Sequence, residues 1–238
     1  MRKMLICIFI LVCPLMAKSH GMDAMMYFNL GLKSTMTIKK INYFSRALEL
    51  NPSLAEAYEK RGILYYFQEK YELMIEDFKS FMELDTPKAK DFRLIGIGYL
   101  KTGRYAESIS WFTRAIEMDP DFAGAYSNRA EAYRFINEYD QSIHDATTAI
   151  RIGGDQLTVS EAYRTRYKIY WKLGLTDKAY ADLRDAWRLD PRVWQIWRKD
   201  SGGLNYPGYT RKMGLMYLIG IAAGLIFKVK LKPPEKDE

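Results

Sequence analysis

Chemically reactive side chains are scarce in this sequence, which has two cysteines and two histidines among 238 residues. Cys7 and Cys13 lie within residues 1–21, so the rest of the chain has no thiol for a disulfide, a metal site or a nucleophile. His20 and His144 are far apart in the sequence, and no phosphate-binding G-x-x-x-x-G-K-S/T loop occurs. We therefore predict no enzyme activity, no catalytic residue, no cofactor and no metal.

Acidic side chains are the remaining source of acid–base chemistry. Glu76 and Asp77, and Asp182 and Asp185, alternate with basic residues, which is typical of a solvent-exposed helix face. A catalytic pair assembled from distant parts of the chain stays open as an alternative, because sequence spacing does not exclude it.

A surplus of one charge is also missing from the body of the chain. The formal net charge is +7, but residues 22–210 hold 27 basic and 26 acidic side chains. The positive charge lies at the two ends, beside apolar segments, where it orients membrane segments. This distribution argues against a nucleic-acid partner.

The first long apolar run has the order of an export signal. Arg2 and Lys3 precede 13 apolar residues, 4–16, and small residues follow. Thirteen residues are fewer than the roughly 20 of a spanning helix. We predict that residues 1–21 are a signal peptide or a signal anchor, and a buried N-terminal helix is the alternative.

The second apolar run lies near the C-terminus. Residues 213–227 form an uninterrupted apolar run, and lysines alternate with apolar residues directly after it. The predicted order is a linker over 201–212, a membrane anchor over 213–231 and a polar tail over 232–238. The alternative is a soluble capping helix. Gly220 and Gly224 have the small-xxx-small spacing that permits close helix approach, so a homodimer through them is possible.

Basic residues flanking the second run predict its orientation. Four lysines follow the segment and two basic residues precede it, which favours a cytoplasmic C-terminus. The body of the chain is then expected on the extracytoplasmic side, periplasmic or lumenal.

The body of the chain repeats every 34 residues. Gly62 and Tyr65 recur as Gly96 and Tyr99, and the segment 47–58 resembles the segment 115–126. This pattern resembles the tetratricopeptide repeat family, whose units are helical hairpins. The resemblance implies an all-α fold, a right-handed α-solenoid of about five helix-turn-helix repeats. The array is predicted over 22–200, with units at about 24–54, 55–88, 89–122, 123–156 and 160–193 and a cap helix over 192–200.

The units depart from one another in ways that predict local differences. Gly31 precedes Ala47 by 16 residues, whereas Gly96 precedes Ala115 by 19, so the first hairpin is short by one helical turn. This unit is either an N-terminal cap or the place where a missing partner helix docks. Residues 157–159 are an insertion before the fifth unit.

Particular residue types predict the turns and the packing. Gly103 and Gly174 are expected at positive φ in the hairpin turns, and prolines 52, 120 and 191 are expected to end second helices. Met74 and Phe81 stand where alanine is usual, which predicts looser packing in the second unit.

The family resemblance also implies a partner-binding groove along the first helices. The positions expected to line it are Glu59, Ile63, Tyr66, Phe67, Arg93, Ile97, Leu100, Lys101, Ser127, Asn128, Glu131, Arg134, Phe135, Arg164, Lys168, Trp171 and Lys172. Chaperone-binding members of the family hold a terminal carboxylate with a set of lysines and asparagines. This chain does not carry that set at the matching positions, since only Asn128 fits.

Taken with the terminal segments, these features predict a non-enzymatic scaffold for a protein partner, exported and membrane-tethered. The scaffold would act in an envelope or secretory assembly. An enzyme or enzyme subunit with a site across repeats, and a soluble cytoplasmic adaptor, are the alternatives.

Overall fold

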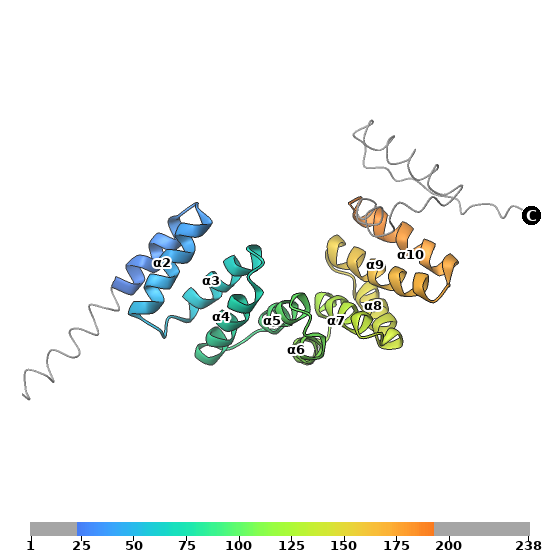
Figure 1. Ribbon diagram of the computed structural model, residues 1–238, viewed down its shortest axis with the longest axis horizontal. Helices are drawn as coiled ribbons and strands as arrows, with labels where there is room; N and C mark the ends of the chain where they lie inside the picture. The colour runs from blue at the N-terminus through green and yellow to red at the C-terminus, as the bar shows by residue number, and fades with distance from the viewer. Residues whose placement is uncertain (1–22, 193–238) are drawn as a thin grey trace, which may run out of the picture. The chain divides into compact units, whose positions relative to one another are not determined.

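The computed structural model describes residues 23–192, and every regular element in that range is an α-helix. A helix over residues 23–33 is followed by nine more (Figure 1). These are α2 (Thr37–Leu50), α3 (Ala55–Phe67), α4 (Tyr71–Leu84), α5 (Ala89–Lys101), α6 (Tyr105–Met118), α7 (Ala123–Phe135), α8 (Tyr139–Ile152), α9 (Gln156–Lys172) and α10 (Thr176–Leu189).

The helices form antiparallel pairs, because three-residue turns join the two helices of each pair. From the second pair on, the middle turn residue has positive φ: Glu69 (58°), Gly103 (79°), Asn137 (64°) and Gly174 (72°). The predicted conformation of the two glycines is confirmed. Prolines 52, 120 and 191 each follow the C-cap of a second helix, as expected.

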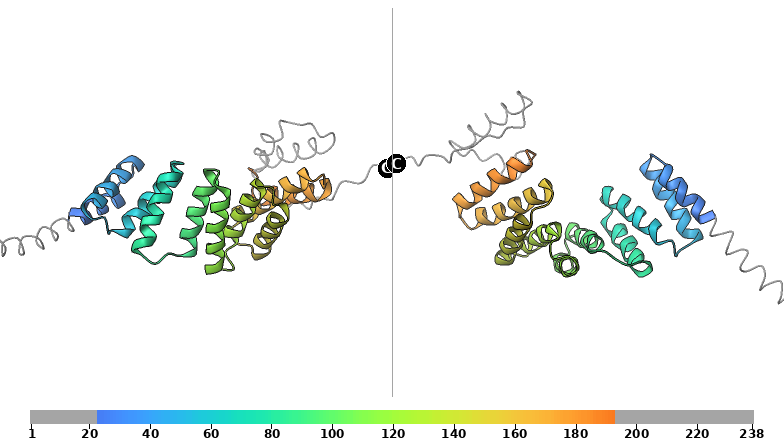
Figure 2. Two further views of the ribbon diagram at one scale, coloured as in Figure 1. Left: turned by 60° about the horizontal axis from the view of Figure 1, so that its bottom comes forward. Right: turned by 180° about the vertical axis from the view of Figure 1, so that it is seen from behind.

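Successive pairs stack in chain order, and the second helix of each pair packs against the first helix of the next. Figures 1 and 2 show the pairs following one another from blue to orange without folding back. The predicted all-α solenoid of helical hairpins is therefore confirmed.

In the first three pairs the two helices approach each other closely at a glycine. A Cβ atom added to Gly96 would lie 2.5 Å from Cε1 of Phe112, which is fully buried. Gly62 has the same relation to Phe78, and Gly31 to Phe44. The spacing from glycine to phenylalanine is 16 residues in the second and third pairs and 13 in the first.

The three missing residues of the first pair belong to its first helix. That helix ends two residues after Gly31, whereas α5 ends five residues after Gly96. Because the Gly31–Phe44 contact is kept, the shortening removes one turn without changing how the two helices meet.

The expectation of looser packing around Met74 and Phe81 is wrong. Met74 is fully buried and Phe81 is 7% exposed, and both belong to one core with Phe78, Ile95 and Tyr99. Gly98 of α5 provides the space, since a Cβ there would lie 2.6 Å from both Met74 Cε and Ile75 Cγ1. A small residue on the facing helix compensates for large ones on α4.

The expectation of solvent-exposed acidic faces is also wrong for two of the aspartates, Asp77 and Asp182. Asp77 and Asp182 are each 4% exposed. Arg61 Nη2 and Nε donate to Asp77 at 2.7 and 2.9 Å, and Arg166 holds Asp182 in the same bidentate way. Arg129 and Asp145 form the third such pair.

Each of these arginines also connects two repeats. Its Nη1 donates to a hydroxyl on the second helix of the preceding pair, at 2.8–2.9 Å. The acceptors are Ser45, Thr113 and Thr147. One guanidinium therefore joins three helices, and the charge is neutralised where it is partly buried.

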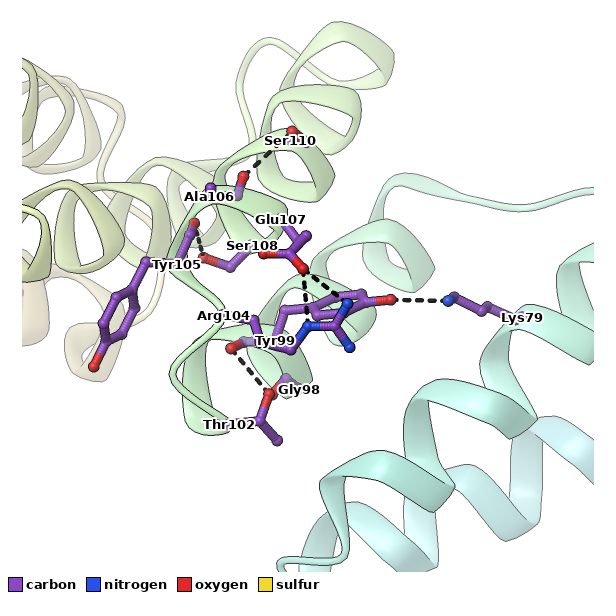
Figure 3. Close-up of polar contacts among 10 residues, drawn as sticks. All are labelled: Lys79, Gly98, Tyr99, Thr102, Arg104, Tyr105, Ala106, Glu107, Ser108 and Ser110. Carbon is purple, nitrogen blue, oxygen red and sulfur yellow. Dashed lines mark hydrogen bonds and ion pairs between the residues drawn. The ribbon is translucent and has the colours of Figure 1, made fainter.

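The third pair, α5 and α6, replaces this ion pair with an aromatic stack. Ile95 and Trp111 stand at the equivalent positions, and Trp111 stacks on Tyr99 with an interplanar angle of 9°. Arg104 lies over Tyr99, with its Cζ 4.4 Å from the ring centroid, and the Tyr99 hydroxyl accepts from Lys79 Nζ at 2.8 Å (Figure 3). Lys79 belongs to α4, so this cluster also joins neighbouring repeats.

Several predictions fall outside the described residues. They concern the signal over 1–21, most of the cap over 192–200, the linker over 201–212, the anchor over 213–231 with Gly220 and Gly224, and the tail over 232–238. Within residues 23–192, no helix is both long enough and apolar enough to cross a membrane.

Candidate partner-binding groove

A cavity of about 560 Å³ lies against α5, α7 and α9, the first helices of three successive pairs. It also borders the connections that precede α7 and α9. The helices that the sequence assigned to the groove therefore do share a concave site, and inter-repeat connections close one side of it.

Eight of the seventeen residues predicted to line the groove border this cavity. They are Tyr66, Arg93, Ile97, Leu100, Lys101, Asn128, Glu131 and Arg164. Apolar side chains from α5 thus lie beside charged groups from all three helices, a mixture suited to an extended polypeptide.

The other predicted residues lie elsewhere. Glu59 borders a separate cavity of about 330 Å³ and pairs with Lys60 and Lys90. Ile63 packs against the core around Met74, and Phe67 is 74% exposed.

The remaining positions make contacts within the array. Phe135 stacks on Tyr105 with ring centroids 4.7 Å apart, and Arg134 lies over Phe135. Ser127 is buried, and its hydroxyl donates to the Thr158 carbonyl at 3.4 Å. The contacts of the other three positions, Lys168, Trp171 and Lys172, include Trp171 with Tyr167 and Lys172 with Asn137.

Sequence reasoning missed the cavity residues contributed by the inter-repeat connections. The insertion before the fifth unit adds a turn to the start of α9, which has 17 residues where α3, α5 and α7 each have 13. Leu157, Thr158 and Glu161 reach the cavity from this part of α9. The three-residue insertion was the signal that marked them.

The start of α9 is fixed by two features of the connection. Gly153 and Gly154 have φ of 83° and 109°, conformations that favour glycine. Asp155 then caps α9, because its carboxylate accepts from Thr158 N at 3.0 Å and from Thr158 Oγ1 at 2.6 Å. These hydrogen bonds lower the pKa of Asp155.

Arg93 is held in one position within the cavity. Its Nε donates to Asn128 Oδ1 at 2.8 Å, and its guanidinium lies 5.6 Å from the centroid of the Phe122 ring. Gly124 lies against the same group, since a Cβ there would be 3.0 Å from Arg93 Nε. Burial lowers the pKa of Arg93, because the cation has lost water without gaining an ion pair.

Glu161 is the acidic counterpart in the same cavity. Burial raises the pKa of Glu161, while Arg164 and Arg93 favour its charged form and Glu131 opposes it. Glu161 makes neither a hydrogen bond nor an ion pair with any residue in the described range. The site therefore holds charged groups of both signs that do not neutralise one another directly.

The stacked antiparallel pairs and the cavity along their first helices define a helical-repeat α-solenoid. Residues 98–134 match the family described as TPR repeat. This stretch, from the end of α5 to the end of α7, is therefore similar to a tetratricopeptide repeat.

The chain also resembles known proteins in sequence and in fold. The chain is 26% identical over 155 residues to Tetratricopeptide repeat protein 6 from Homo sapiens. That alignment covers 64% of this chain and 29% of the human protein, so the chain spans less than a third of that relative.

Two solved structures share the fold. The structure titled "Crystal structure of MamA protein" has a TM-score of 0.62 and 23% identity, covering 74% of this chain and 96% of that one. YrrB, titled "a TPR protein with an unusual peptide-binding site", has a TM-score of 0.59 and 19% identity, covering 74% and 92%.

Proposed function

We propose that this protein is a non-enzymatic scaffold that binds a segment of a protein partner in the cavity between α5, α7 and α9. The observation that carries the proposal is the composition of that cavity, where Tyr66, Ile97 and Leu100 lie beside incompletely paired charges. Apolar side chains supply burial for a partner, and fixed charges supply orientation.

The repeat array suits this role because it is rigid at the cavity. The arginines of the buried arginine–aspartate pairs also donate to hydroxyls of the preceding hairpin, and the Asp155 cap fixes the start of α9. A preorganised surface loses little conformational entropy when a partner binds.

Export and membrane tethering belong to the same proposal. The order of basic, apolar and small residues in 1–21, and the apolar run over 213–227 flanked by basic residues, support it. The array would then act outside the cytoplasm, within an envelope or secretory assembly, with the C-terminus in the cytoplasm.

Partner binding is tested by photocrosslinking in intact membranes. A crosslinking amino acid replaces Leu100 in the full chain, and the same replacement at exposed Glu117 is the matched control. We expect a discrete adduct from position 100 and none from position 117. Recovery of the protein as an unpartnered monomer from both variants would contradict the proposal.

Topology is tested separately with reporter fusions. One reporter follows Asp200 and another follows Glu238, so that they bracket the apolar run. We expect the first reporter to be active outside the cytoplasm and the second inside it. Activity of both on the same side would remove the anchor from the proposal and leave the scaffold role intact.

A further inference from the structure

The cavity contains two charged groups that face it from different helices and do not pair with each other. Arg93 comes from α5 and Glu161 from α9, and both border the same 560 Å³ space. Each is close enough to affect the charge of the other, yet no hydrogen bond or ion pair joins them among the described contacts. Space for another molecule therefore lies in a field with a positive and a negative end.

The positive end is built to hold an anion. Asn128 occupies the Arg93 Nε, so the two terminal nitrogens remain available, and within residues 23–192 they have no hydrogen-bond partner. Phe122 and Gly124 fix the plane of the guanidinium. A fixed guanidinium edge with two free N–H groups matches the two oxygens of a carboxylate.

The acidic part of the cavity is the Glu161 carboxyl with Glu131 on the neighbouring helix α7, and Arg164 and Lys101 line the same space. Glu131 lies 3.8 Å from Arg134 Nη2, which is a long ion pair. A basic side chain between these two carboxylates would gain both as partners and would relieve their mutual repulsion.

We propose that the cavity binds a partner segment that carries an acidic side chain at Arg93 and a basic side chain at Glu161. The inference rests on the proposed scaffold function and names the class of ligand for that site. Ile97 and Leu100 lie in the same cavity and contact the apolar part of the segment between the two charges. The ligand is thus a charged pair in a fixed order, which sets the direction of the bound chain.

Defined peptides test this directly with the full chain in detergent. The probes are fluorescent 12-residue peptides, acetylated and amidated so that no terminal charge remains, with two leucines in a Gly-Ser background. One set carries an aspartate and a lysine separated by two to six residues in either order. Matched sets replace the aspartate by asparagine, the lysine by glutamine, or both.

For the wild-type chain we expect one separation and order to bind at least about 10-fold more tightly than either single-charge peptide, since each charged contact contributes a comparable factor. Arg93→Ala should abolish the preference for aspartate and keep the preference for lysine. Glu161→Gln should do the reverse. Arg151→Ala and Glu117→Gln are the matched controls, because both residues are exposed outside the cavity, and they should change nothing.

Gly124→Ala separates positioning from charge. It leaves every charge in place and favours the helix, because alanine has the higher helix propensity, but it crowds Arg93. We expect a folded protein, shown by its circular dichroism, with a weakened preference for aspartate.

Peptide binding that is equal across the four sets, or absent from all of them, would overturn the inference. The same holds if the crosslinked adduct at position 100 persists in the double variant R93A/E161Q, which would leave the scaffold function standing. Absence of the adduct from the chain that carries the crosslinking residue at position 100 and is otherwise unchanged would instead contradict the scaffold function itself.

Discussion

At the scale of single residues, the hairpin turns contain side chains at positions whose backbone conformation favours glycine. The middle residue of each hairpin turn from α3 on has positive φ, and glycine fills this position in two of four turns. Glu69 carries a side chain there, in a conformation that costs L-residues about 1–2 kcal/mol.

We predict that Glu69→Gly raises the free energy of unfolding by about 0.5–1 kcal/mol, the gain being reduced by the entropy of glycine in the unfolded chain. Gly103→Ala is the matched opposite change and should lower it by about 1 kcal/mol. Urea titration followed by circular dichroism measures both. Equal effects of the same sign would show that φ does not decide the outcome.

Two carboxyl groups should make the stability of the fold depend on pH in opposite directions. Burial raises the pKa of Glu161, so the fold favours its protonated form and the resulting stability is lost as pH rises from the unfolded pKa through the folded one. Hydrogen bonds from Thr158 lower the pKa of Asp155, so its stability is present above the unfolded pKa and lost as pH falls through the folded one.

Urea titrations between about pH 3 and 7 test this with Glu161→Gln and Asp155→Ala. As pH rises, the free energy of unfolding of the wild type should fall relative to that of Glu161→Gln. Asp155→Ala should cost about 1 kcal/mol at neutral pH and less in acid, since the cap is lost. Two differences that stay constant with pH would contradict both assignments.

At the scale of helices, the sequence pattern was sufficient for the hairpins and insufficient for the charges between them. The 34-residue period, the turn glycines and the prolines led to the correct paired helices, because these signals are local. The buried aspartates were misread because Asp77 and Asp182 share their helices with exposed acidic residues, and only the position of an arginine on the partner helix distinguishes them. The extra turn of α9 could be located but not interpreted, since its contacts are with α7.

The ion pairs between helices give a prediction at this scale. Arg129→Ala leaves Asp145 buried without its partner, and we expect a loss of about 3 kcal/mol in the free energy of unfolding. The double change R129I/D145W copies the Ile95 and Trp111 of the third pair and should recover most of it. Urea unfolding of the wild type and of both variants measures these changes in the free energy of unfolding.

The control is the exposed pair Arg104 and Glu107, for which Glu107→Ala should change the free energy of unfolding little, because solvent screens the pair. A cost at Arg129 as small as at Glu107 would show that the buried pairs do not stabilise the stack.

At the scale of the whole molecule, the described array is a chain of neighbours. Each hairpin packs on the next, and among the first helices α7 and α9 are in extensive contact while α5 and α7 touch little. This arrangement explains why sequence reasoning could name eight of the residues that line the cavity and missed those near the connections between repeats. Family spacing locates the helix faces, whereas the connections that close the cavity depend on how two repeats meet.

A stack of this kind unfolds in sections, because stability is a sum over repeats and the interfaces between them. Met74→Ala opens a cavity in the core that joins α4 to α5, where Gly98 supplies no side chain to fill it. We expect a local loss of about 2–5 kcal/mol. Amide hydrogen exchange should accelerate across α2 to α5 and change little in α8 to α10, which share no core residue with Met74.

Leu183→Ala in α10 is the matched change at the other end of the described range, since Leu183 is 3% exposed. Its effect on exchange should be confined to α9 and α10. Uniform acceleration across the array by either substitution would mean that residues 23–192 open as one unit. In that case ligand binding between α5 and α9 would stabilise every repeat equally, whereas a sectional array would transmit it only to the neighbours of the cavity.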